Sequence, residues 1–109
     1  MKRMGLCIGL NPEVIPQYRE VHAAVWPEVL AVITKANIRN YSIFLREPEN
    51  MLFAYWEYHG TDFVADAAVM AENAAMQKWW TICDPMQVPL ATRAKGEWWA
   101  NMVEVFHHD

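Results

Sequence analysis

Two apolar runs separated by a proline-containing turn constrain the fold of this chain more than any other feature of its sequence. Side chains alternate between two faces in residues 39–46, and they do so again in residues 51–59. Alternation of this kind is typical of β-strands, whose neighbouring side chains point to opposite faces. The Glu-Pro-Glu-Asn stretch at 47–50 has the composition of a turn. We therefore expect the two runs to pair as an antiparallel hairpin.

Strand and helix signals alternate along the rest of the chain. Asn11 and Pro12 fit the cap and the first position of a helix, and Pro27 breaks the same helical region. After the hairpin, Thr61 or Asp62 fits the cap of a second helical region. The expected elements are a strand at 3–10, helices at 12–24 and 28–36, strands at 39–46 and 51–59, helical segments at 63–70 and 74–83, a loop at 84–96 and a final strand at 97–106.

The expected order of elements, βαββαβ, is that of a ferredoxin-like α+β fold, an antiparallel sheet with both helical regions on one face. With 109 residues the chain is long enough for one domain, spanning 1–109, and too short for a second. In the strand at 51–59, large apolar side chains occupy both faces. Because the helices cover only one face, we expect a second copy of the chain to cover the other, which predicts a homodimer with two facing sheets.

Composition and charge exclude several classes of partner. The net charge is −4 and the basic residues are scattered, so we expect no nucleic-acid partner. No apolar stretch is long enough to span a membrane, and the N-terminal residues do not resemble an export signal. We therefore expect a cytoplasmic protein without a membrane partner, in which Cys7 and Cys83 remain free thiols.

Aromatic and histidine side chains are the candidates for chemistry, because no motif for a metal, nucleotide or serine-hydrolase site occurs. Tyr18 and His22 are spaced so that a phenol and an imidazole lie side by side on a helix. An imidazole at the edge of a core can exchange protons near neutral pH. Spacing alone, however, favours a structural histidine at this position.

Two pairs of adjacent tryptophans add aromatic surface. Trp79 and Trp80 would point about 100 degrees apart on a helix, so one fits the core while the other reaches an interface or a pocket. Taken alone, this pair is more typical of dimer packing than of ligand binding. Trp98 and Trp99 begin the expected final strand, which would place one ring on each face of the sheet for packing.

A series of short motifs extends along nearly the whole chain. The motifs are Asn11-Pro12, Tyr18-x-x-x-His22, Trp26-Pro27-Glu28, Asn40-Tyr41-x-Ile43, Asn50-x-Leu52-Phe53, Trp79-Trp80 and Glu104-Val105-Phe106. In this order and at these intervals they resemble the L-rhamnose mutarotase family, cofactor-free enzymes that interconvert the α and β anomers of a 6-deoxyhexose. The tyrosine-histidine pair, the Trp-Pro-Glu step and the double tryptophan are specific as a set.

This resemblance implies a fold, a site and a chemistry. Members of the family form a dimeric α+β barrel from ferredoxin-like protomers and use neither a metal ion nor a coenzyme. The position of the catalytic histidine, a proton donor, falls on His22. Sugar-binding positions fall on Tyr18, Tyr41, Trp79 and Trp80. Because opening a hemiacetal moves a proton off one oxygen and onto another, the histidine needs a counterpart, which a phenol or a bound water could supply; Tyr18 is our candidate for it.

One stretch departs from the family pattern. Typical members carry an Asn-Pro-Asp-Asn-Ser-Pro-like loop before the last strand, whereas this chain has a different sequence over 84–99. Since this stretch follows the double tryptophan, we expect it to shape the pocket and to affect the choice of substrate more than the reaction. L-Rhamnose and L-fucose, both 6-deoxyhexoses, remain open as substrates.

Two other functions fit the expected fold. Dimeric α+β barrels host several chemistries, so a cofactor-free monooxygenase acting on an aromatic ring is one alternative. A non-catalytic small-ligand-binding dimer, with His22 as a core residue, is the other. Neither alternative accounts for the occurrence of Tyr18, His22, Tyr41 and the double tryptophan in one chain.

Overall fold

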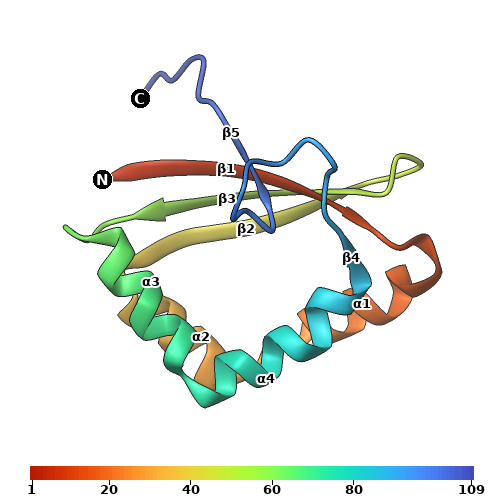
Figure 1. Cartoon of the computed structure of the whole chain (residues 1–109), viewed down its shortest axis with the longest axis horizontal. Helices are drawn as coiled ribbons and strands as arrows, with labels where there is room; N and C mark the ends of the chain where they lie inside the picture. The colour runs from red at the N-terminus through yellow and green to blue at the C-terminus, as the bar shows by residue number, and fades with distance from the viewer.

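Helices lie on one face of a curled antiparallel sheet (Figure 1). The structure, a computed structural model, describes residues 1–109. Its strands are β1 (Lys2–Leu10), β2 (Ile38–Arg46), β3 (Met51–Tyr58), β4 (Gln87–Val88) and β5 (Ala100–Met102). Its helices are α1 (Ile15–Ala23), α2 (Pro27–Lys35), α3 (Phe63–Glu72) and α4 (Ala74–Cys83), with short 3-10 turns η1 (Pro12–Val14) and η2 (Asp84–Met86).

Strand β1 lies inside the sheet and has antiparallel neighbours on both edges. The order across the sheet is β2-β3-β1-β4, and β5 also pairs with β1. Leu10 of β1 pairs with Gln87 of β4, whereas Cys7 pairs with Ala100 of β5. The position of the last strand in the ferredoxin-like order is therefore shared by two short strands along one edge of β1.

Two predictions for the C-terminal part of the chain were wrong. The strand expected at 97–106 is only Ala100–Met102, and residues 87–88, expected to lie in a loop, form β4. Segments of two or three residues are too short to show a detectable alternation of side chains. Their strand conformation comes from backbone hydrogen bonds to β1, which the local sequence does not encode.

Most helix signals in the sequence correspond to caps in the structure. The Asn11 side chain accepts a hydrogen bond from the Glu13 backbone N–H at 3.0 Å, although the turn that it caps is 3-10 rather than α. Asp62, and not Thr61, caps α3. Asn73 ends α3 and caps α4, which produces the expected interruption between the two. None of the four helices has the length and apolar character needed to cross a membrane.

The two faces of the sheet differ in burial. We refer to the side covered by helices as the inner face and to the opposite side as the outer face. Leu52 points to the inner face and is 2% exposed, whereas Phe53 and its partner in register, Phe44, lie on the outer face with 37% and 64% of their surface exposed. The outer side of β1 carries small residues, as predicted. At Gly9 a Cβ atom would lie 2.7 Å from the Val88 carbonyl oxygen, so only glycine fits beside β4.

Candidate active site

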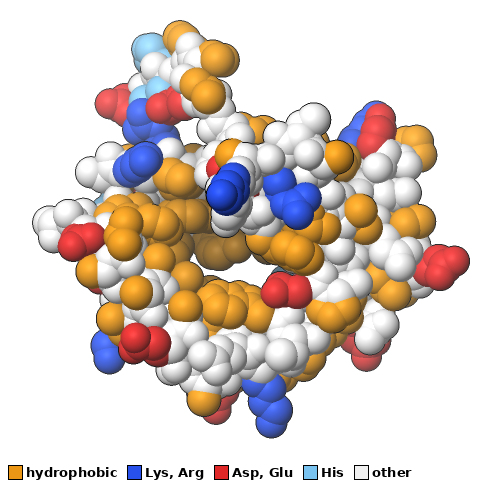
Figure 2. Space-filling view, viewed as in Figure 1, with side chains coloured by type: hydrophobic (Ala, Val, Ile, Leu, Met, Phe, Trp, Pro, Cys, Tyr) orange, Lys and Arg blue, Asp and Glu red, His pale blue; other side chains and the backbone are white.

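A cavity opens between the helices and the inner face of the sheet. Figure 2 shows the molecule hollowed at this place, with hydrophobic side chains around the hollow. Three adjoining lobes of about 490, 340 and 490 Å³ make up the cavity, and both His22 and Ile43 line all three. Cavities of this size and apolar lining are typical of small-molecule sites.

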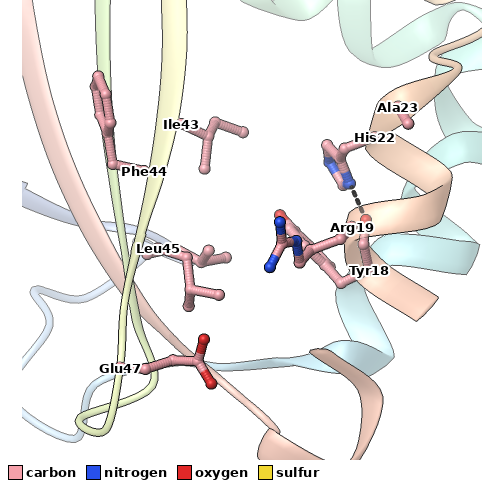
Figure 3. A pocket seen from close by; sticks show the side chains of 9 residues that line it. Tyr18, Arg19, His22, Ala23, Ile43, Phe44, Leu45 and Glu47 are labelled. Atoms are coloured by element: carbon pink, nitrogen blue, oxygen red, sulfur yellow. Dashed lines mark hydrogen bonds between the residues drawn. The ribbon is translucent and has the colours of Figure 1, made fainter. Parts of the chain in front are cut away.

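His22 presents a free basic nitrogen to this cavity. Its Nδ1 lies 2.8 Å from the backbone carbonyl oxygen of Tyr18, one turn earlier in α1 (Figure 3). Because a carbonyl oxygen only accepts hydrogen bonds, Nδ1 carries the hydrogen and Nε2 keeps its lone pair. Burial of the ring lowers the pKa of His22 below its ordinary value of 6.5. His22 is therefore neutral at neutral pH, and its Nε2 can accept a proton.

Tyr18 lies against His22, as the spacing predicts. The two ring centroids are 4.1 Å apart and the ring planes are inclined by 25°. Tyr18 is 4% exposed, and its hydroxyl accepts a hydrogen bond from the side-chain nitrogen of Gln87 at 3.1 Å. Burial raises the pKa of Tyr18 well above its ordinary value, and the bond from Gln87 offsets only part of this effect. The phenol therefore stays protonated at neutral pH.

The double tryptophan forms one wall of the cavity on α4. Trp79 is buried and contacts the His22 ring edge to face, with centroids 5.3 Å apart. It contacts Trp26 in the same manner at 5.2 Å. Trp80 is half-buried and also lines the cavity. One ring thus sits in the core beside the histidine while its neighbour reaches the pocket, which is the division expected from helical geometry.

Tyr41 reaches the cavity from the sheet through a β-bulge. The register between β2 and β3 shifts between Arg39 and Ser42, and Asn40 at the bulge has a φ of 52°, a left-handed conformation that asparagine tolerates. The Tyr41 ring lies 6.5 Å from that of Trp56. Tyr41 keeps 41% of its surface exposed, yet desolvation by the surrounding protein raises its pKa to about 12. Its hydroxyl is therefore neutral at neutral pH.

All five site residues predicted from the sequence line one lobe of the cavity. Tyr18, His22, Tyr41, Trp79 and Trp80 surround the lobe of about 340 Å³. They come from two helices and one strand that are separate in the sequence and adjacent in the fold. The lobe combines a neutral base, protonated phenols and aromatic walls. Such a set suits proton exchange on a small neutral ligand with both apolar and hydroxyl groups.

The structure offers no metal-binding cluster and no reactive cysteine beside these five residues. No three His, Cys, Asp or Glu side chains lie together in a way that could hold a metal ion. Cys7 and Cys83 are free and buried, as expected. Cys83 lines the cavity, but burial raises the pKa of its thiol to about 12, so it is not a thiolate at neutral pH.

The whole chain is similar to L-rhamnose mutarotases. A sequence model of the L-rhamnose mutarotase family matches residues 3–108. The chain belongs to this family. The L-rhamnose mutarotase of Oceanobacillus iheyensis is 33% identical over 109 residues, which cover 100% of both chains, and that of Bacteroides thetaiotaomicron is 34% identical over 89 residues, covering 81% of this chain and 83% of the relative. The crystal structure of L-rhamnose mutarotase from Formosa agariphila has a TM-score of 0.78 at 24% identity and covers 100% of both chains.

Membership of the L-rhamnose mutarotase family identifies the reaction class as the interconversion of sugar anomers. The Formosa agariphila structure confirms the α+β fold with its curled antiparallel sheet over the full length of the chain. These similarities favour neither a monooxygenase nor a non-catalytic binding protein.

Besides Ile43 and Cys83, four more residues that the sequence did not identify as site residues line this lobe. All four lie in the stretch of residues 84–99 that departs from the family pattern. Trp98 and Trp99 do not alternate across the sheet as expected, because β5 begins only at Ala100. No pattern singles out one glutamine in an apparent loop. The four residues are Asp84, Gln87, Trp98 and Trp99.

Two charged side chains line the first lobe of about 490 Å³. Arg19 of α1 and Glu47, just after β2, both border it and are exposed (Figure 3). The sequence identifies Glu47 only as part of the hairpin turn, and it gives no signal for Arg19. The family motifs likewise mark neither residue, because Tyr18 and His22 are the only positions of this helix that carry the resemblance.

Proposed function

We propose that this mutarotase exchanges the α and β anomers of a 6-deoxyhexose in the cavity beside His22. The observation that carries the proposal is the hydrogen bond from His22 Nδ1 to the Tyr18 carbonyl oxygen, since it leaves Nε2 as an acceptor inside an aromatic cavity. Anomer exchange requires the anomeric hydroxyl to lose a proton and the ring oxygen to gain one. Both oxygens are bonded to the same carbon, so one imidazole can serve both.

Ring opening then proceeds as a proton relay through His22. Nε2 takes the proton of the anomeric hydroxyl, the C1=O double bond forms, and the bond between C1 and the ring oxygen breaks. The imidazolium delivers the proton to the ring oxygen, which gives the neutral open-chain aldehyde. Rotation about the C1–C2 bond and the reverse steps close the ring as the other anomer. In ring opening and again in ring closure, His22 first accepts a proton and then donates it. Proton donor is the role that the family resemblance implies.

Tyr18 supports this relay as a hydrogen-bond donor to the ring oxygen. That oxygen carries negative charge between cleavage of its bond to C1 and arrival of the proton. The Tyr18 hydroxyl is buried in the same lobe, and its raised pKa disfavours a phenolate. We therefore assign Tyr18 as the counterpart of His22 through electrostatic stabilisation of the oxygen, without complete transfer of the phenol proton.

The remaining predicted residues bind the sugar. Trp79 and Trp80 offer apolar surface for the C–H groups and the 6-methyl group of a deoxyhexose. Tyr41 faces them from the sheet side with a neutral hydroxyl, which can donate to or accept from a sugar hydroxyl. These contacts orient the anomeric carbon toward His22, and no step of the proposal uses a cofactor.

L-Rhamnose is the first substrate to test, because the similar proteins are named for this sugar. L-Fucose is the second candidate. It is also a 6-deoxyhexose, and the lobe takes four residues from between 84 and 99, where the sequence differs most from the family pattern. The sugars differ in the orientation of hydroxyl groups, which these residues would contact.

We also propose that two copies of the chain pair through their outer faces. Phe44, Phe53 and Met102 lie on this face with 64%, 37% and 42% of their surface exposed. Apolar surface that strands of a sheet present together is typical of an interface. Two sheets facing each other would form the dimeric α+β barrel that the sequence leads us to expect. The cytoplasmic location stays a prediction from the sequence.

Saturation-transfer proton NMR of the anomeric signals tests the proposed reaction. We expect the wild-type protein to accelerate exchange of L-rhamnose, L-fucose or both. His22→Ala should lower that rate by about 10²–10⁴-fold while the protein remains folded by circular dichroism. His59→Ala is the matched control, because His59 is exposed at the end of β3 and does not line the cavity. It should leave the rate unchanged.

Three results would contradict the proposal. Exchange at the buffer rate for both sugars would show that neither is a substrate. Oxygen consumption with a quinol, without anomer exchange, would favour a monooxygenase. Calorimetric binding of either sugar without faster exchange would favour a non-catalytic binding protein.

A further inference from the structure

A chain of hydrogen bonds ends on the Tyr18 hydroxyl. The indole Nε1–H of Trp98 donates to Gln87 Oε1 at 2.7 Å, and Gln87 Nε2 donates to the Tyr18 hydroxyl oxygen at 3.1 Å. Gln87 is 9% exposed and is the only polar or charged residue in the buried set. A buried amide is unfavourable unless both of its ends are hydrogen-bonded. Here both ends are bonded, one to the loop and the other to the active-site phenol.

The chemistry of these three groups fixes the direction of each bond. An indole N–H can only donate, so it faces the oxygen of the amide and turns the NH₂ group toward Tyr18. An NH₂ group also only donates, so the Tyr18 oxygen accepts and the phenol hydrogen points elsewhere. No protein group accepts a hydrogen bond from this hydroxyl, and Tyr18 lines the cavity. The hydrogen is therefore directed to whatever occupies the lobe.

We propose that Gln87, oriented by Trp98, is a positioning residue that holds the Tyr18 hydroxyl as a hydrogen-bond donor toward the sugar. This inference rests on the proposed function and deepens it. The Tyr18 carbonyl makes His22 Nε2 an acceptor, and the bond from Gln87 makes the Tyr18 hydroxyl a donor. The two neighbouring groups thus enter the reaction with opposite and preset hydrogen-bonding roles, so no reorientation is needed as charge develops.

The variant Gln87→Glu reverses this arrangement with little change in shape. At mildly alkaline pH a glutamate side chain is ionised and only accepts, so it would take the hydrogen of Tyr18 as well as that of Trp98. We expect the exchange rate at saturating sugar to fall about 10²-fold, as in Tyr18→Phe. Gln77→Glu is the matched control. Gln77 is exposed on α4 and bonds to the Ala71 carbonyl oxygen, outside the lobe, so the rate should not change.

A double variant separates positioning from packing. If Gln87 acts through the Tyr18 hydroxyl, Gln87→Glu has no further effect in a Tyr18→Phe background. A fall in rate in both backgrounds would overturn the proposal, because Gln87 would then only support the shape of the cavity. A folded Gln87→Glu protein with an undiminished rate would also overturn it. If Gln87→Glu does not fold, Trp98→Phe removes the indole donor instead and is tested in the same two backgrounds.

Hydrogen exchange of the Trp98 indole N–H, measured by NMR, tests the orientation without any activity. We expect slow exchange in the wild type and fast exchange in Gln87→Met, which lacks the acceptor. Fast exchange in the wild type would overturn the proposal whatever the substrate is. Slow exchange in a protein that accelerates neither sugar would instead refute the proposed function, and the catalytic part of this inference would fall with it.

Discussion

The inner and outer faces of the sheet carry similar apolar side chains, but the chain itself covers only the inner one. Adjacent residues show the difference, since Leu52 is 2% exposed on the inner face and Phe53 is 37% exposed on the outer face. The cavity between the inner face and the helices also holds hydrogen-bonded polar groups, among them His22 of α1 and the buried Gln87 of β4. One strand thus supports a core and a site on one side, and on the other it presents a surface suited to assembly.

The largest expected difference between the faces is in their contribution to stability. Leu52→Ala should lower the free energy of unfolding by about 2–5 kcal/mol, because it leaves a cavity among buried side chains. Phe53→Ala should cost less at low protein concentration, since over a third of that side chain is already in water. Urea unfolding of both variants measures the difference.

Protein concentration sharpens this test. If a second copy covers Phe53, the loss of stability in Phe53→Ala should grow as the concentration rises, because association stabilises the folded state by mass action. The loss in Leu52→Ala should not depend on concentration. Equal losses at all concentrations for both variants would contradict the division between the faces.

A charge on the outer face should disrupt assembly while leaving the chain folded. Phe44→Asp combined with Phe53→Asp would place two unpaired carboxylates in the proposed interface, which we expect to raise the dissociation constant by about 10²-fold or more. Sedimentation equilibrium should find a wild-type dimer and a monomeric variant. A wild-type monomer, or a variant dimer as tight as the wild type, would disprove the proposed pairing.

A change in the aromatic wall that α4 contributes to the cavity, opposite the inner face, should weaken sugar binding modestly. Trp80→Leu keeps apolar bulk but removes the stacking surface, worth about 0.5–1.5 kcal/mol. This corresponds to a rise of about 2- to 13-fold in the KM for the sugar. We expect kcat to stay nearly unchanged, as measured by the concentration dependence of NMR exchange. Tyr55→Phe on the outer face is the control, since it removes only a hydroxyl that bonds to Glu57. A lower kcat with an unchanged KM would show that Trp80 does not bind the sugar.

The smallest expected effect concerns a polar cluster at one end of the outer face. Glu57 accepts hydrogen bonds from His59, Tyr55 and Asn40, which lower its pKa to about 2. The carboxylate is thus favoured in the folded state, and its contribution is present above pH 4.5, the ordinary pKa of this group, and lost as the pH falls toward 2. Glu57→Gln should flatten the fall of the melting temperature over this range. An unchanged slope would show that exposure and screening cancel the effect.

Much of the fold is predictable from the sequence because its signals are local. Asn11, Asp62 and Asn73 mark helix starts through side chains that cap the nearest backbone N–H groups. Alternation over eight or nine residues identifies β2 and β3. Strands β4 and β5 escape prediction because their conformation depends on pairing with β1, a partner far away in the sequence.

The site likewise contains residues that local sequence signals predict and residues whose roles depend on distant parts of the chain. Tyr18 and His22 are predictable as neighbours since helical spacing alone brings them together. The resemblance to the family motifs adds Tyr41, Trp79 and Trp80 to the predicted site. The bulge at Asn40 that directs Tyr41 into the cavity is visible only in the structure. Gln87 and Trp98 could not be predicted, because their roles depend on contact between β4 and the segment before β5, which are separate in the sequence. The directions of the hydrogen bonds from Trp98 to Gln87 and from Gln87 to Tyr18 follow from this contact, and neither segment encodes them alone.

The central claim is that α1 presents to the cavity a neutral imidazole, that of His22, whose lone pair is on Nε2. ¹⁵N–¹H correlation spectra of His22, recorded across pH together with the rate of anomer exchange, test this claim most directly. We predict a hydrogen on Nδ1 at neutral pH and a pKa below 6.5. The exchange rate should be constant above that pKa and should fall with the same midpoint as the pH decreases, because a protonated Nε2 cannot accept. A hydrogen on Nε2 at neutral pH, or a rate that stays constant while His22 titrates, would contradict the account.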